Sequence, residues 1–174
     1  MKGNAVIGQS GGPTAVINAS LAGAVEAAVA GDLIDRIYGM RYGIRGLLDD
    51  DLVDLSTLGP ERLARLARTP SSALGSTRYK LTDDDLPAVL EALKARDIRY
   101  FFLIGGNDTM DTIHRVETYC RENGYELRGV GIPKTVDNDL YGTDHTPGFP
   151  SAARDIALSV QQAARLARDM QKVD

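Results

Sequence analysis

Short hydrophobic runs alternate along the chain with segments in which hydrophobic residues recur every three or four positions. Residues 4–8 form the first run, and a helical period follows over residues 17–28. The runs at 100–104 and 128–132 are also followed by helical segments. Repeated strand–helix pairs are typical of βαβ units. The pattern therefore predicts an α/β fold, three-layer and Rossmann-like, with a largely parallel sheet flanked by helices.

The remaining elements follow from the same criteria. The run at 100–104 has no polar alternation, which is typical of a strand covered by helices on both faces. Thr82 and Asp85 have the spacing of a capping box, so a helix is expected to begin after them. Further strands are predicted at 33–40 and 52–55, further helices at 60–68, 109–123 and 151–170, and loops at 69–80 and 133–150.

The last predicted helix carries a hydrophobic stripe of Ile156, Val160, Ala163 and Ala167. We expect this stripe to pack against the sheet or against a further part of the protein, because a helix with one apolar face normally buries it. An exposed stripe would predict association or aggregation.

The composition limits the classes of function. The chain has 174 residues, 43% of them hydrophobic, with 20 Lys and Arg against 24 Asp and Glu and a net charge of −4. These values predict one folded domain, and the lack of a basic stripe excludes a nucleic-acid partner. No hydrophobic run approaches the ~20 residues that span a bilayer, so we expect a cytoplasmic protein with no membrane partner. Cys120 cannot form a disulfide within the chain and is expected on a buried helix face.

The first polar loop, residues 8–14, follows the first strand and contains Gly11 and Gly12. Paired glycines before a helix let backbone N–H groups approach an anion, which suggests a phosphate cradle. The spacing matches neither the Walker loop nor the dinucleotide fingerprint, so a plain tight turn remains an alternative.

The second loop, residues 105–109, places Asn107 and Asp108 at a helix N-terminus. Either residue could serve as a helix cap. Two glycines before the cap exceed what capping requires. We favour a site for Mg²⁺ and a polyphosphate, because this cation binds one or two carboxyl or carbonyl oxygens together with substrate phosphates.

The third loop, residues 131–139, has the composition of a phosphoryl-transfer centre. Lys134 supplies a compact positive charge, Thr135 a hydroxyl, and Asp137 and Asp139 two carboxylates. The alternative is a solvated, Asx-rich turn. We favour the reactive site because these groups concentrate at the carboxyl end of a strand.

Together, these motifs resemble the phosphofructokinase family, in order and over nearly the whole chain. The match includes Gly11-Gly12 with Asn18, Gly75 to Arg78, residues 105–109, residues 133–139, and Gly142 to Asp144 with Gly148-Phe149. The resemblance implies the family's fold and a transferase of glycolysis.

Two positions indicate the phosphoryl donor. ATP-dependent members of the family carry Gly where this chain has Asp108 and Lys134, and pyrophosphate-dependent members carry Asp and Lys. An Asp side chain would crowd and repel the α-phosphate of ATP, and Lys134 would attract a compact pyrophosphate. The implied reaction is the reversible transfer of a phosphoryl group from pyrophosphate to the 1-hydroxyl of fructose 6-phosphate, by a diphosphate–fructose-6-phosphate 1-phosphotransferase.

The resemblance also implies roles in catalysis. Asp137 is implied as the general base that takes the proton of the sugar hydroxyl, and Thr135, Lys134 and Asp139 as the other catalytic residues. The sugar is expected to contact Thr135, Val136 and Asp137.

Donor and metal binding are assigned in the same way. Mg²⁺ is expected at Asn107 and Asp108, although the family's usual acid is Asn107 here. Pyrophosphate is expected to bind Gly11, Gly12, Arg78, Gly106, Asp108 and Lys134.

The resemblance implies that residues 1–174 are an N-terminal phosphoryl-donor-binding α/β domain and that the C-terminal sugar-phosphate half is absent. We therefore expect this chain to be inactive alone and the complete enzyme to be a homo-oligomer, a dimer or tetramer. Two alternatives remain, namely an ATP-dependent 6-phosphofructokinase and a non-catalytic phosphate-binding or regulatory subunit.

Overall fold

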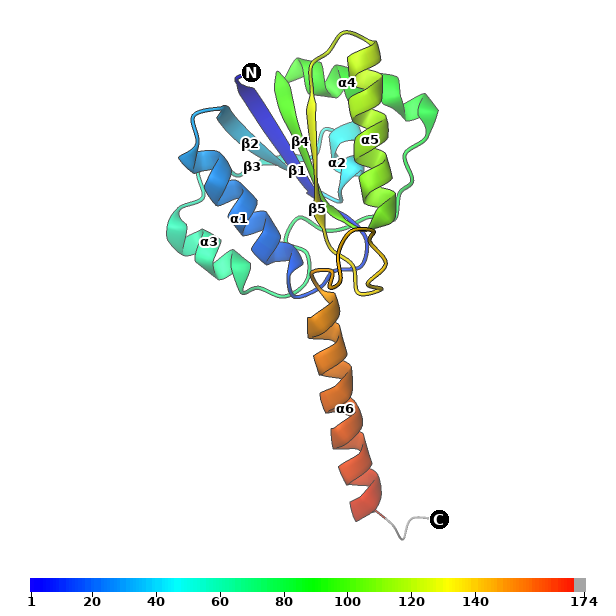
Figure 1. Cartoon of the computed structure of the whole chain (residues 1–174). Coiled ribbons are helices and arrows are strands. Elements are labelled where there is room, and N and C mark those ends of the chain that lie inside the picture. The colour runs from blue at the N-terminus through cyan, green and yellow to red at the C-terminus, as the bar shows by residue number, and fades with distance from the viewer. Residues whose placement is uncertain (171–174) are drawn as a thin grey trace.

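A five-stranded sheet lies between two layers of helices in the computed structural model, which describes residues 1–170 (Figure 1). The strands are β1 (Gly3–Gln9), β2 (Ile34–Met40), β3 (Leu52–Asp54), β4 (Ile98–Gly105) and β5 (Arg128–Pro133). The helices are α1 (Ile17–Ala30), α2 (Ile44–Leu48), α3 (Pro60–Ala67), α4 (Leu86–Ala95), α5 (Asn107–Glu122) and α6 (Phe149–Asp169), with the 3₁₀ turn η1 (Asp83–Asp85) before α4.

The strand order β3-β2-β1-β4-β5 positions the site. All neighbouring strands are parallel except β2 and β3, which are antiparallel. The chain moves from β1 to β2 on one side, and later continues from β4 to β5 on the other side. The order therefore reverses between β1 and β4, and the loops that leave these two strands flank a crevice at their carboxyl ends.

Each face of the sheet has its own hydrophobic core. Val6 and Phe101 point to the face covered by α2, α4 and α5, and Ile7 and Ile104 point to the face covered by α1 and α3. These four side chains are fully buried, as expected of central parallel strands. The predicted three-layer α/β fold with a largely parallel sheet is confirmed.

The sequence pattern located most elements within a few residues. Thr82 and Asp85 form the predicted capping box, with Asp85 Oδ2 accepting the Thr82 N–H at 2.8 Å. Cys120 is buried on α5 as predicted, and burial raises the pKa of its thiol to about 11, which makes it a poor nucleophile. The pattern missed α2, because five residues are too few to show a helical period.

Helix α6 differs most from its predicted environment. It projects from the domain rather than lying on the sheet (Figure 1), and none of its residues is buried. Ile156 and Val160 are 63% and 61% exposed. The expectation that the stripe packs on the sheet is therefore wrong. Within residues 1–170, α6 and the other helices all fall short of the length and hydrophobicity needed to cross a membrane.

Replacing Ile156 and Val160 together by Glu should change the free energy of unfolding of the domain by less than about 0.5 kcal/mol, because both side chains are largely exposed. Leu93→Ala in α4, at a fully buried position, should lower it by about 2–5 kcal/mol. Urea denaturation followed by tyrosine fluorescence measures both. A loss in the α6 variant as large as that of Leu93→Ala would show that α6 packs on the domain.

Candidate functional site

The three polar loops meet at the carboxyl ends of β1, β4 and β5. Backbone hydrogen bonds continue the strand pairing into them: Ser10 N–H donates to Ile104 O at 2.9 Å, and Lys134 N–H donates to Gly105 O at 3.0 Å. The glycine loop (residues 8–14), the Asn-Asp loop (residues 105–109) and the lysine loop (residues 133–148) therefore start side by side at this rim.

Lys134 joins the lysine loop to the glycine loop. Its ammonium Nζ donates to the carbonyl of Gly12 at 2.6 Å. A Cβ atom at Gly11, where φ is +74°, would lie 3.3 Å from the same nitrogen. Glycine at position 11 thus permits both the backbone conformation and the close approach of the cation.

The charge of Lys134 is held in a buried position, where only 3% of the residue is exposed. Burial lowers the pKa of the ammonium below its ordinary value of 10.5, because it disfavours the charged form. The carboxylate of Asp137 opposes this decrease, and the guanidinium of Arg78 adds to it. A bound anion would offset the cost of burying this cation.

A fourth segment, the arginine loop (residues 69–80), completes the rim beside the glycine loop. The Ser76 hydroxyl donates to the carbonyl of Gly11, and the Gly11 N–H donates to the carbonyl of Thr77 at 3.4 Å. In this structure the Gly11 N–H therefore points at the arginine loop, although the family resemblance implies that it contacts pyrophosphate. The exposed Arg78 follows directly.

The Asn-Asp loop forms no side-chain helix cap. Gly106 is the N-cap residue of α5, so Asn107 and Asp108 are its first helical residues and the capping alternative does not apply. Gly105 is required by packing, since a Cβ there would lie 2.2 Å from Thr109 Oγ1. The nearest atoms to a Cβ at Gly106 belong to the lysine loop, 3.8 Å away or more, which is ordinary van der Waals contact, so packing does not require glycine there.

Asn107 connects the Asn-Asp loop to the lysine loop, because its Nδ2 donates to Asp139 Oδ2 at 2.8 Å. Asp108 is exposed and lies 4.0 Å from Lys80 of the arginine loop. Within residues 1–170 no three His, Cys, Asp or Glu side chains converge to hold a metal ion by themselves. The Asp108 carboxylate and the Asn107 amide oxygen fit Mg²⁺ bound jointly with phosphate oxygens.

Polar contacts that the sequence analysis missed shape the lysine loop. Asn138 has a φ of +54°, and its Oδ1 accepts the N–H of Thr146 at 2.8 Å. The fully buried Thr146 hydroxyl donates to the carbonyl of Thr135 at 2.9 Å. The Thr135 hydroxyl in turn accepts the N–H of Asp137 at 3.1 Å. Asn tolerates a left-handed conformation better than most residues, so Asn138 was a sequence signal for a turn at this position.

The residues predicted for the site thus gather at one rim. Asp108 differs from the expectation in its contacts. Lys134 is electrostatically coupled to Asp137 and Arg78. Asp108, among the residues that the structure describes, makes its ion pair with Lys80 and not with Lys134. It reaches the same edge of the sheet from the next loop.

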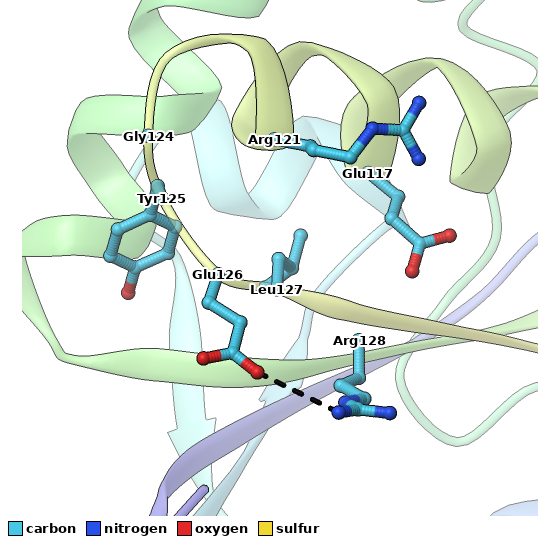
Figure 2. Close-up of a pocket in the computed structure, with 7 residues that line it drawn as sticks. All are labelled: Glu117, Arg121, Gly124, Tyr125, Glu126, Leu127 and Arg128. Carbon is cyan, nitrogen blue, oxygen red and sulfur yellow. Dashed lines mark ion pairs between the residues drawn. The ribbon is translucent and has the colours of Figure 1, made fainter.

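Figure 2 shows a surface hollow at the turn between α5 and β5, where Arg128 pairs with Glu126 at 3.6 Å. This turn precedes β5, so the hollow lies at the opposite end of the sheet from the rim. It is lined by Glu117, Arg121, Gly124, Tyr125, Glu126, Leu127 and Arg128.

Comparisons with known proteins agree with this geometry. Residues 4–173 match a family described as Phosphofructokinase. The chain is 48% identical to a pyrophosphate–fructose 6-phosphate 1-phosphotransferase of Rhodospirillum rubrum (90% of this chain, 39% of the relative) and 46% identical to the one of Halomonas elongata (92% and 40%). A crystal structure of a pyrophosphate-dependent phosphofructokinase from Nitrosospira multiformis superimposes with a TM-score of 0.92 at 44% identity, covering 98% of this chain and 43% of that one.

The lowered pKa of Lys134 makes the stability of the chain depend on pH. Between the folded-state pKa and the unfolded value near 10.5, the unfolded chain binds more protons, so stability rises with pH across this interval. Relative to Lys134→Met, the wild-type chain should therefore become more stable as the pH rises from 8 to 10.5. Urea denaturation of both chains at several pH values measures the difference. If the difference in the free energy of unfolding between the two chains stays constant over this range, burial does not lower the pKa of Lys134.

Proposed function

The chain belongs to the phosphofructokinase family, and we propose that it binds pyrophosphate as phosphoryl donor for transfer to the 1-hydroxyl of fructose 6-phosphate. The carrying observation is the buried ammonium of Lys134, held against the carbonyl of Gly12 at the rim where the loops meet. Among residues 1–170 no carboxylate forms an ion pair with this ammonium, and a buried cation of this kind favours an anionic ligand.

Pyrophosphate suits this rim better than ATP. Lys134 and Arg78 offer positive charge close together, which a small and highly charged donor requires. Asp108, at the start of α5, adds bulk and negative charge where a longer nucleotide would continue. The similar proteins from Rhodospirillum rubrum and Halomonas elongata are named for pyrophosphate, which supports this choice.

In the proposed reaction, the Asp137 carboxylate accepts the proton of the sugar 1-hydroxyl while that oxygen forms a bond to one phosphorus of pyrophosphate. The bridging P–O bond breaks, and inorganic phosphate leaves with the bonding electron pair. Lys134 and Arg78 stabilise the negative charge that moves onto the leaving phosphate, and Thr135 hydrogen-bonds the transferring group. Asp139, held by Asn107 at 2.8 Å, keeps the lysine loop near the Asn-Asp loop.

Mg²⁺ would be held by Asp108 and by the amide oxygen of Asn107, and it would screen the charge between donor and acceptor. The Asn107 Nδ2 already donates to Asp139, which leaves the amide oxygen for the cation. We expect Gly106 and Gly12 to contact pyrophosphate and Val136 to contact the sugar, since all three lie in the loops at the rim.

The chain spans about two fifths of the length of the relatives reported above. We propose that residues 1–174 form the donor-binding α/β domain and that groups for the sugar phosphate come from another part of the active enzyme. The exposed apolar stripe of α6 supports a further packing partner, as a homo-oligomer or second domain would supply.

Combining Lys134→Gly with Asp108→Gly should lower the affinity for Mg²⁺-pyrophosphate by about tenfold or more, because a charge-assisted contact is lost. Isothermal titration calorimetry on the chain measures this. Lys94→Ala with Asp111→Ala is the matched control, since it removes the same charges from α4 and α5 and should leave the affinity unchanged. Unchanged affinity in the first variant, or tighter binding of ATP than of pyrophosphate by the wild-type chain, would overturn the donor assignment.

The chain alone should bind pyrophosphate but show no fructose 1,6-bisphosphate formation, because the groups that bind the sugar phosphate are expected in another part of the active enzyme. A coupled assay with pyrophosphate and fructose 6-phosphate checks this. Steady turnover by the isolated chain would refute the division of the site between two parts, whereas absence of pyrophosphate binding would refute the donor site itself.

A further inference from the structure

Two side-chain amides lie in the interior behind the glycine loop. Gln9 is the last residue of β1, Asn18 is in the first turn of α1, and both are fully buried. Gln9 Nε2 donates to Asn18 Oδ1 at 2.9 Å and to the carbonyl of Ile17 at 3.2 Å. Neither residue faces the rim, although Asn18 matches the family's first phosphate loop. Their function must therefore lie in what they hold.

Both amides bind the beginning of the arginine loop. Gln9 Oε1 accepts the Ser72 hydroxyl at 2.7 Å and the Leu74 N–H at 2.9 Å. Asn18 Oδ1 accepts the Ala73 N–H, and its Nδ2 donates to the carbonyl of Thr69, each at 2.9 Å. These partners are 51 to 65 residues away in sequence.

The backbone partners determine the orientation of each amide. Leu74 N–H and Ala73 N–H can only donate, and the carbonyls of Ile17 and Thr69 can only accept, so neither side chain can be rotated by 180° without losing bonds. Every donor and acceptor position of the Gln9 amide is used. A buried network of this kind holds a single arrangement, because an unmade bond is costly in the interior.

The held segment leads directly to the donor site. The Ser72 hydroxyl also contacts the carbonyl of Gly75 at 2.8 Å, and Gly75 has a φ of +74°. After this turn, Ser76 donates to the carbonyl of Gly11, and Arg78 comes close enough to Lys134 to lower its pKa. We infer that Gln9 and Asn18 are positioning residues that set Arg78 against the glycine loop for pyrophosphate binding.

The identity of the ligand in this inference rests on the proposed function, but the positioning of the arginine loop by Gln9 and Asn18 does not. Two measurements therefore test the two parts separately. The first is hydrogen–deuterium exchange of the backbone amides of residues 70–78. Asn18→Ala removes the bonds to Thr69 and Ala73 without adding a charge, and Ser72→Ala removes one contact at the half-buried end of the network. Both should raise exchange in this segment by about tenfold and leave α4 unchanged.

The second measurement is pyrophosphate affinity in a double-mutant cycle. Asn18→Ala, which adds no charge, should weaken Mg²⁺-pyrophosphate binding by about fivefold in the wild-type chain and by less than about twofold in an Arg78→Ala background. A role in general stability would give the same loss in both backgrounds. Asn4→Ala is the matched control. It removes the Nδ2 bond to the carbonyl of Arg96 at the other end of β1, and should leave affinity and loop exchange unchanged.

Unchanged exchange of residues 70–78 in both the Asn18 and the Ser72 variant would overturn the inference, and so would an equal loss of affinity with and without Arg78. If the wild-type chain does not bind pyrophosphate, the proposed function fails. The exchange measurement then still decides whether the two amides hold the arginine loop.

Discussion

The buried ammonium of Lys134 is the constraint on which the arrangement of the site depends. Transferring a cation from water into a protein is unfavourable unless nearby dipoles or opposite charges compensate. Here the direct partner is a neutral carbonyl, that of Gly12. Asp137 opposes the decrease in the pKa, and Arg78 increases it. The ammonium of Lys134 is thus only partly stabilised by its own contacts, which is unfavourable for stability and favourable for binding a small anion.

The strand order explains why separate loops meet near the ammonium of Lys134. Parallel strands end at the same edge, and the reversal between β1 and β4 leaves the space between their loops free of a crossing connection. β5 then brings Lys134 next to Gly105 through a backbone bond of 3.0 Å. The arginine loop has no strand of its own at this edge, so the buried amides hold its beginning while its bonds to Gly11 hold the segment at the rim.

The local sequence pattern was sufficient to predict the features of the fold that depend on residues close together in the sequence. The uninterrupted hydrophobic run around Phe101 identified β4 and its burial, and the capping spacing at Thr82 identified the start of the helix that follows. The position of α6 could not be predicted, because a stripe such as that at Ile156 has the same period whether or not a partner covers it. The partners of Gln9 in the arginine loop could not be predicted either, since they lie more than 60 residues away and a polar strand end normally indicates exposure.

The neutrality of the two buried amides is consistent with the charge of the rim. A carboxylate in place of Gln9 or Asn18 would accept the same backbone N–H groups, but it would add a buried negative charge one loop away from Lys134. Such a charge would raise the pKa of the ammonium and reduce the positive potential available to a ligand. An amide supplies the donors and acceptors that hold the arginine loop without altering that potential. The structure thus separates positioning, done by neutral groups in the interior, from attraction of the ligand, done by charged groups at the rim.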